Sequence, residues 1–120
     1  MHKISIKPAY QDFRGKITDL ITEHINSIAQ ITFTKDSIRG NHVHEQTTQW
    51  VFIIYGKIEG VTKVGEKIIT QIFNKGDFLV SYPGEPHAFR ALEPSEILTF
   101  TAGPRAGADF NSDTFPNKLI

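Results

Sequence analysis

The sequence predicts an all-β protein, folded as a small closed barrel. Glycines divide the chain into short segments rich in Val, Ile, Phe, Thr and Tyr, and strands at such regular spacing are typical of sandwiches and barrels. No stretch of helical length has an apolar period of 3.6 residues. Residues 50–55 read W-V-F-I-I-Y, so this strand needs cover on both faces. A barrel with a further layer or a partner subunit outside it provides that cover.

The turn signals place ten strands in order along the chain. V-G-E-K at 64–67 is typical of a hairpin, because glycine supplies the positive φ of a tight turn. N-K-G-D at 74–77 predicts a second turn. Residues 19–26 are expected to hold one helical turn. The predicted strands are 3–7, 16–21, 27–34, 42–46, 49–55, 57–64, 67–73, 77–81, 85–91 and 96–101.

The length and composition fit one domain. A chain of 120 residues with 39% apolar residues and nine Phe should bury about two-thirds of its unfolded surface. We expect a single domain over residues 1–120, with its barrel core at about 27–101 and a β extension before it.

Charge and cysteine content exclude several classes of function. Thirteen basic and thirteen acidic residues cancel without a basic cluster, which argues against a nucleic-acid partner. The absence of cysteine excludes disulfides and thiolate sites and fits a reducing compartment. No apolar run has the length of a signal peptide or a membrane span. A cytoplasmic protein without a membrane partner is expected.

Histidines provide the first chemical signal. His42 and His44 are separated by one residue, so in a strand their side chains share a face. Gln49 opens the next predicted strand, and His87 follows the distant turn P-G-E-P. These residues are expected to meet only if the sheet closes on itself. An isolated H-x-H pair can equally be a solvated, hydrogen-bonded pair.

The spacing resembles the two motifs of the cupin superfamily. The first, G-x5-H-x-H-x4-E-x6-G, is matched by His42, His44 and Gly56, with Gln49 in place of Glu and Asp36 in place of Gly. The second, G-x5-P-x-G-x2-H-x3-N, is matched at three anchors and departs at two positions. The anchors are Gly76, Gly84 and His87, and the departures are Tyr82 for Pro and Ala91 for Asn. The resemblance implies a single cupin barrel, also described as a double-stranded β-helix or jelly roll.

In metal-binding cupins the matching positions hold a divalent ion, which implies His42, His44, Gln49 and His87 as ligands here. The candidate ions are Zn, Ni, Fe and Mn. An amide carbonyl lacks the charge of a carboxylate. With Gln49 in place of Glu, the affinity for an oxygen-preferring ion such as Mn²⁺ should therefore fall most, and the affinity for an imidazole-preferring ion should fall least. The alternative is metal-free chemistry, with histidine as acid or base and Gln49 as its orienting partner. No nucleotide cofactor is expected.

Two short stretches resemble one branch of the superfamily. R-G-N-H-V-H at 39–44 is similar to the R-G-x-H-x-H of nucleotide-sugar cupins, including dTDP-sugar 3,4-ketoisomerases and capsule-sugar enzymes. D-F-R-G at 12–15 is similar to the D-x-R-G of dTDP-sugar 3,5-epimerases. The resemblance implies that His42 is the general base. Gln49 agrees with the ketoisomerases, which tend to carry Gln at this position.

Roles follow for the remaining candidates. His42, His44 and Tyr82 are the expected catalytic residues, and Arg39, Gln49 and Arg90 the expected substrate contacts. Arg39 can bind a diphosphate or fix the turn before the strand, and Tyr55 is expected in the core. Glu45 and Asp36 are the acids nearest to His42 in sequence, whereas Arg105 and Asp109 are candidates to close the mouth of the site.

Three functions remain open at this point. The first is a sugar-nucleotide isomerase or epimerase, in which imidazole, with an ordinary pKa of about 6.5, removes and returns a proton. The second is a metal-dependent cupin, such as a dioxygenase. The third is a non-catalytic module that binds a sugar or a small acid. An anionic sugar nucleotide is the expected ligand, and the two-sided strand at 50–55 together with the N-terminal β segment predicts a homodimer.

Overall fold

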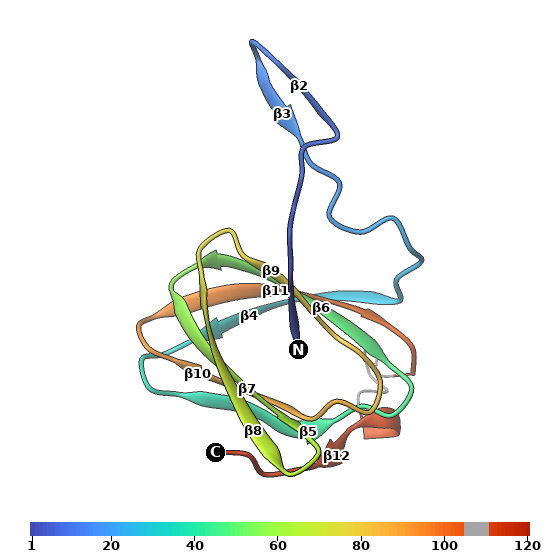
Figure 1. The fold of residues 1–120 in the computed structure, drawn as a ribbon, viewed down its shortest axis with the longest axis vertical. Coiled ribbons are helices and arrows are strands. Elements are labelled where there is room, and N and C mark those ends of the chain that lie inside the picture. Colours follow the sequence, from blue (N-terminus) through green and yellow to red (C-terminus); the bar gives the residue numbers. More distant parts are fainter. Residues whose placement is uncertain (105–110) are drawn as a thin grey trace.

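The computed structural model describes residues 1–104 and 111–120, which form two five-stranded antiparallel sheets and a separate hairpin (Figure 1). The β6 sheet has the strand order β1-β9-β6-β11-β4, and the β10 sheet has the order β12-β5-β10-β7-β8. The strands are β1 (His2–Ile4), β2 (Tyr10–Asp12), β3 (Gly15–Ile17), β4 (Ser27–Phe33), β5 (Ile38–Val43), β6 (Thr48–Tyr55), β7 (Lys57–Val64), β8 (Lys67–Asn74), β9 (Phe78–Ser81), β10 (His87–Ala91), β11 (Ser95–Ala102) and β12 (Phe115–Pro116).

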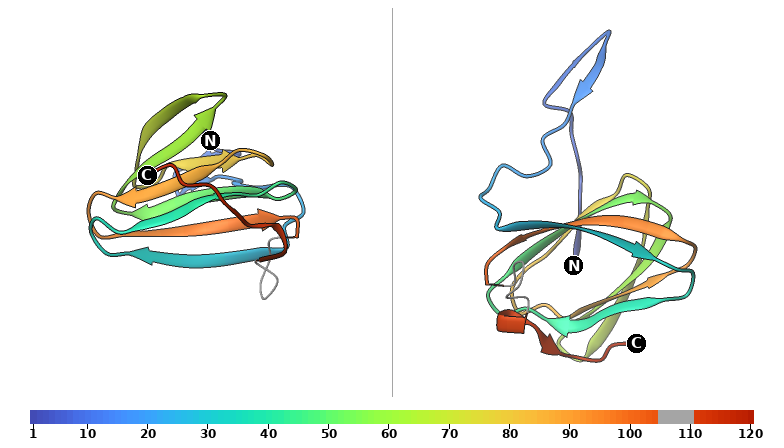
Figure 2. Two further views of the ribbon diagram at one scale, coloured as in Figure 1. Left: turned by 90° about the horizontal axis from the view of Figure 1, so that it is seen from below. Right: turned by 180° about the vertical axis from the view of Figure 1, so that it is seen from behind.

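The chain passes repeatedly from one sheet to the other between β4 and β11, as it does in a jelly roll. The two sheets lie face to face (Figure 2). The predicted all-β jelly roll is therefore confirmed. Within the described ranges it consists of two facing sheets, and no hydrogen-bonded ring of strands joins them.

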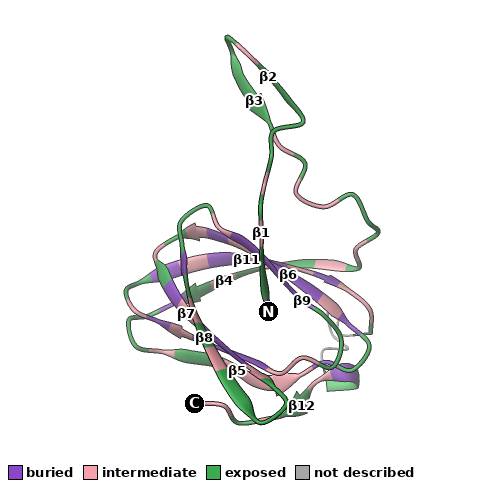
Figure 3. Ribbon diagram, viewed as in Figure 1, coloured by how far each residue is buried: buried purple, intermediate pink, exposed green. Residues whose placement is uncertain are grey.

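The main core lies between the sheets (Figure 3). Inward side chains of both sheets are fully buried there, among them Val51, Ile53, Phe73 and Leu79. Burying a side chain of this size contributes roughly 1.5–3 kcal/mol, so this layer supplies much of the stability and holds the strands that carry the site.

A second apolar cluster covers the outer face of the β6 sheet. Trp50, Phe78 and Val80 are buried there, although they point away from the main core. The chain before β4 supplies the cover with the side chains of Ile4, Ile6, Leu20, Ile21 and Ile25. Strand 50–55 is thus covered on both faces, and the outer layer comes from the protein's own N-terminal segment.

The N-terminal segment also forms an arm that projects from the sheets. Strand β1 pairs with β9, and the β2–β3 hairpin extends away from the rest of the molecule (Figures 1 and 2). An ion pair of 2.7 Å between Asp12 and Arg14 ties its turn. Phe13 at the tip is 97% exposed.

Several predicted boundaries are wrong. Residues 19–26 contain no helical turn, because Leu20, Ile21 and Ile25 pack against the outer sheet face in an irregular segment, and strand 16–21 ends at Ile17. Strand β5 covers Ile38–Val43 instead of the predicted 42–46, so His44 follows the strand. The short strands β2 and β12 were not predicted. None of the described residues forms a helix long and apolar enough to span a membrane.

Candidate active site

A β-bulge in β5 directs Arg39 and His42 to the same cavity. Consecutive residues of β10, beginning at His87, lie opposite His42 and Gly40, so Asn41 is the extra residue. Gly40 and Asn41 have φ values of 88° and 56°, a left-handed region in which glycine is unstrained and asparagine is enriched. The bulge allows residues three apart to share a face, whereas a regular strand requires a spacing of two.

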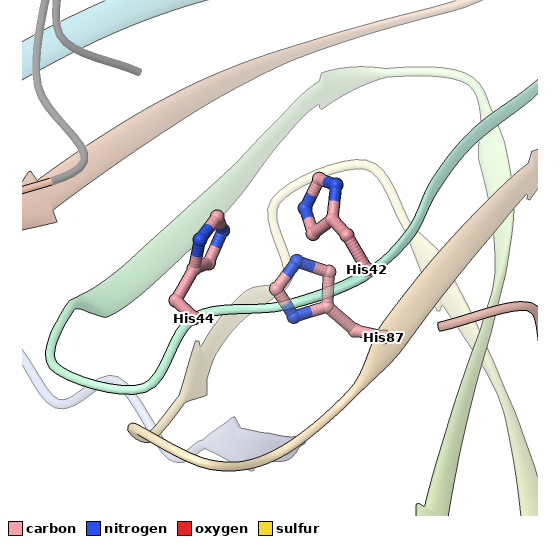
Figure 4. Close-up of side chains that lie close together, drawn as sticks. All are labelled: His42, His44 and His87. Carbon is pink, nitrogen blue, oxygen red and sulfur yellow. The ribbon is translucent and has the colours of Figure 1, made fainter. Parts of the chain in front are cut away.

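Three imidazoles converge between the sheets (Figure 4). The ring centroids lie 4.6 Å apart for His42 and His44, 4.7 Å for His42 and His87, and 5.3 Å for His44 and His87. One nitrogen of each ring lies within 4.8 Å of the other two. His44 and His87 are buried, and His42 is partly exposed. We call these three residues the histidine cluster.

The cluster forms because β5 and β10 are neighbouring strands. His42 and His87 lie opposite each other in the antiparallel pairing, so closure of the sheet is not what brings them together. Gln49 reaches the site from the other sheet, where its neighbours across β6 are Ser81 and Thr101. The site therefore lies between the two sheets, with histidines on one side and an amide on the other.

A cavity of about 60 Å³ lies beside the cluster. This volume is room for a few water molecules, so only a small part of a ligand can enter it without rearrangement. Its lining combines polar and apolar side chains on both sheets, namely Ile31, Phe33, Arg39, His42, Gln49, His87, Phe89, Ile97 and Thr99, with the backbone of Gly40.

Asp113 joins the C-terminal segment to the turn that follows His44. Nδ1 of His44 lies 2.7 Å from the Asp113 main-chain oxygen, and the Asp113 carboxylate accepts hydrogen bonds from Thr47 and from the main chain of Glu45 and Gln46. Burial by itself would raise the pKa of this carboxyl. The three hydrogen bonds and the nearby His44 hold the pKa below its ordinary value.

Arg39 lies at the cavity and is already held in place. Its guanidinium lies 5.4 Å from the centre of the Phe33 ring, and Nη2 donates to the Thr32 carbonyl oxygen at 3.1 Å. The side chain nevertheless remains exposed, so its other donors can meet an anion.

Three other candidates lie away from the cavity. Arg90 pairs with Glu59 of the neighbouring strand β7 at 3.3 Å. Tyr82 is 54% exposed, with its ring centroid 5.6 Å from that of His2. Tyr55 is also exposed, at the end of β6, so its expected place in the core is wrong.

Sequence reasoning missed Asp113. Its contacts join residues 66–69 positions apart, and nothing in the local sequence S-D-T indicates them. Glu45 and Asp36, the two acids considered for His42, have exposed side chains. Arg105 and Asp109 lie outside the described residues.

The chain is similar to known proteins in sequence pattern and in fold. The cupin family model matches residues 13–112, and no curated protein sequence matches. Among solved structures, QdtA, a sugar 3,4-ketoisomerase from Thermoanaerobacterium thermosaccharolyticum in complex with TDP, has a TM-score of 0.76 at 19% identity, covering 97% of this chain and 87% of that one.

Two further structures are similar. A dTDP-4-dehydrorhamnose 3,5-epimerase from Sulfolobus tokodaii has a TM-score of 0.69 at 18% identity, with 93% of this chain and 72% of that chain covered. A 3,4-ketoisomerase from Helicobacter canadensis has a TM-score of 0.66 at 24% identity, with 82% and 78% covered. At these identities the likeness shows a shared fold.

Proposed function

This chain belongs to the cupin family, and we propose that it isomerises or epimerises the keto-sugar of a sugar nucleotide by histidine acid–base catalysis. One observation carries the proposal: His42 is the partly exposed member of the histidine cluster, and it shares one cavity with Arg39 and the neutral Gln49. The similar QdtA structures contain TDP or TDP-4-keto-6-deoxyglucose, which supports a ligand of this class.

The chemistry requires a base next to a carbon acid. His42 takes the proton from the carbon beside the ketone, the C–H electron pair forms the C=C bond of an enediolate, and the carbonyl π pair moves to oxygen. Protonation of the same carbon from the opposite face, by a water molecule rather than by His42, gives the epimer; the hydroxide left behind takes the proton from His42. For isomerisation, the hydroxyl proton passes to the former carbonyl oxygen and carbon is protonated at the other centre.

The size of the cavity limits what lies inside it. About 60 Å³ can take only the reacting end of the sugar, so the diphosphate would lie at the mouth. Arg39 is exposed there and can donate more than one hydrogen bond to phosphate. The proposal gives Gln49 the task of orienting the sugar and assigns no role to Arg90 or Tyr82, which lie elsewhere.

Deuterium exchange tests this function. The protein in D₂O should introduce deuterium into a dTDP-4-keto-6-deoxy sugar, which proton NMR can follow. The exchange rate should fall at least about 100-fold in His42→Ala, in line with the usual contribution of a general base. His24→Ala is the control, because His24 is exposed and far from the cluster in the chain. Absence of exchange with several keto-sugar nucleotides would reject the proposal. Binding of such a ligand without exchange would favour the non-catalytic binding module.

Metal binding is a second candidate function, and the ligand nitrogens favour it. Around one tetrahedral zinc ion three nitrogens lie about 3.3 Å apart, given Zn–N bonds of about 2.0–2.1 Å. The cluster nitrogens lie within 4.8 Å of one another, so small side-chain rotations would suffice. His42, His44 and His87 would hold an imidazole-preferring ion, Gln49 would be a weak fourth ligand, and the ion would polarise a bound carbonyl or water.

Elemental analysis of untagged protein tests this candidate. One equivalent of Zn²⁺, Ni²⁺ or Fe²⁺ in the wild type, lost in His87→Ala and retained in His24→Ala, would support it. Substoichiometric metal that cannot be restored by adding Zn²⁺, Ni²⁺, Fe²⁺ or Mn²⁺ would reject it.

We also propose a homodimer. The hairpin exposes Phe13, Ile17 and Tyr10 without a large partner surface of its own, and Ile28 on the outer face of the β6 sheet is 58% exposed. A second copy of the chain would bury both surfaces. Light scattering at micromolar concentration should give twice the chain mass, and Phe13→Ser should shift the protein toward monomer. A monomeric wild type would exclude the dimer.

We also propose that the chain is a single domain and that it is cytoplasmic. The first is one domain over residues 1–120, supported by the pairing of β1 and β12 with the strands of the 27–101 core. Limited proteolysis that separates two stable fragments would contradict it. The second is a cytoplasmic location, which the absence of cysteine fits and which cell fractionation can check.

A further inference from the structure

Asp113 makes two kinds of contact, because its side chain binds the turn that follows His44 and its main-chain oxygen binds the His44 ring. The side chain is 1% exposed. Its Oδ1 accepts from the Glu45 amide at 2.9 Å, and its Oδ2 accepts from the Gln46 amide at 3.0 Å and from the Thr47 hydroxyl at 2.7 Å. These bonds fix the position of the Asp113 backbone relative to the turn that follows His44.

The main-chain oxygen of Asp113 then determines the state of the His44 ring. A carbonyl oxygen can only accept a hydrogen bond, so at 2.7 Å the proton must be on Nδ1 of His44. In neutral imidazole the other nitrogen, Nε2, then carries the lone pair. Nε2 is buried and has no hydrogen-bond partner among residues 1–104 and 111–120.

The lone pair is what the site needs at this position. Both a base and a metal ligand use an unprotonated ring nitrogen, and the other tautomer would put an N–H there instead. The His44 ring lies 4.6 Å from that of His42 and 5.3 Å from that of His87, centre to centre. A fixed tautomer of His44 therefore gives the cluster one buried nitrogen with a free lone pair.

We propose that Asp113 is a positioning residue, which holds His44 in the Nδ1–H tautomer and keeps the Nε2 lone pair available to the histidine cluster. The proposal rests on the proposed function for its purpose, but the tautomer is a property of the free protein. It can be measured without substrate and without metal.

The experiment is NMR of protein labelled with ¹⁵N in its imidazole rings, recorded at pH 8 after treatment with a chelator. The wild type should show His44 with a protonated Nδ1 and an unprotonated Nε2. Asp113→Ala should show a mixture of both tautomers, because the turn and the carbonyl are no longer held. Asp113→Asn keeps an oxygen acceptor and the shape of the side chain, so it should retain most of the wild-type tautomer and serves if Asp113→Ala does not fold.

Asp77→Asn is the matched control. Asp77 also binds a turn through its carboxylate, accepting from the Asn74 amide at 2.7 Å, but at the β8–β9 turn. This variant should leave the His44 signals unchanged. An Nε2–H tautomer in the wild type, or the same tautomer population in Asp113→Ala as in wild type, would overturn the proposal.

The exchange assay separates this proposal from the proposed function. Loss of a partner that orients a functional histidine typically costs about 10- to 100-fold in activity or metal affinity, so Asp113→Ala should lower the deuterium-exchange rate by that factor with little change in KM. A wild type with the expected tautomer but without exchange would reject the proposed function and leave the positioning role intact. Exchange that is unaffected in a folded Asp113→Ala variant would reject the positioning role alone.

Discussion

The main-chain oxygen of Asp113 lies 2.7 Å from Nδ1 of His44, although 69 positions separate the two residues in the sequence. The carboxylate of the same aspartate binds the turn that follows His44. One histidine of the cluster is thus held by the C-terminal segment, which also adds β12 to the edge of β5.

We expect acid to remove the stabilisation that Asp113 provides. The folded protein holds the pKa of this carboxyl below its ordinary value, so protons bind more strongly to the unfolded chain at this group. The contribution is therefore complete above the unfolded pKa of about 3.9 and is lost as the pH falls through the lower folded pKa. The melting temperatures of wild type and Asp113→Asn should differ most near pH 7 and approach each other below pH 4. A difference that stays constant between pH 7 and pH 3 would contradict this expectation.

The bulge in β5 predicts different costs for two glycines that have almost the same φ. A Cβ at Gly40 would lie 2.9 Å from the main-chain oxygen of His87, whereas at Gly76 nothing lies within 4 Å. Both alanine variants carry the left-handed penalty of about 1–2 kcal/mol, and Gly40→Ala adds an overpacking cost of about 1–3 kcal/mol. In urea unfolding, the free energy of unfolding should fall more for Gly40→Ala than for Gly76→Ala. Equal losses of unfolding free energy in the two variants would mean that β5 and β10 can move apart at Gly40 without a cost in stability.

Replacing the neutral member of the site should change its preference among metal ions. Gln49→Glu supplies a charged oxygen, which favours oxygen-preferring ions, so its affinity for Mn²⁺ should rise at least about tenfold, or about 1.4 kcal/mol, and by more than its affinity for Zn²⁺. Titration calorimetry with each ion measures both. Gln11→Glu on the exposed hairpin controls for the added charge. Unchanged Mn²⁺ affinity in Gln49→Glu would argue against a shared ligand set with the histidines.

The two arginines predicted as substrate contacts should behave differently. Arg39 lies at the cavity, and Arg90 is paired with Glu59 outside it. A charged hydrogen bond is worth about 1.5–3 kcal/mol, so Arg39→Ala should weaken TDP binding by about 10- to 100-fold, and Arg90→Ala should leave it within about twofold. Calorimetric titration with TDP distinguishes them. Equal effects of the two variants would remove Arg39 from the binding site.

Local patterns explain which parts of the fold could be predicted. Strands β6 to β9 begin and end within about a residue of the expected ranges, because alternation and turn residues act over a few positions. Strand β5, which carries the first motif, is the exception, since it shares only residues 42 and 43 with the predicted 42–46. The bulge is an intermediate case: Gly40 and Asn41 precede His42 in the sequence, and both tolerate positive φ, so a bulge could have been inferred there. Asp36 is similar, since it stands at the leading glycine of the motif and has a φ of 68°.

Contacts between distant segments could not be predicted in this way. Arg39 lies in β5 and Arg90 in β10. Only the bulge and the strand pairing decide that Arg39 lines the cavity and that Arg90 binds Glu59. Strand β2 was not predicted, and nothing in the composition of the β2–β3 hairpin shows that it projects from the sheets (Figure 1).

The amino-acid pattern was enough to predict a β protein of the cupin type, because turn residues, alternation and motif offsets act over short stretches of chain. It also predicted that His42 and His44 face the same site, and their rings do converge, although β5 ends at Val43 and His44 follows the strand. It also indicated His87 and Gln49 through their spacing in two motifs. The pairing of β5 with β10, which brings His42 to His87, and the contact between Asp113 and the His44 ring became evident only in the folded protein. Those contacts depend on which strands become neighbours, and that is decided by packing of the whole chain.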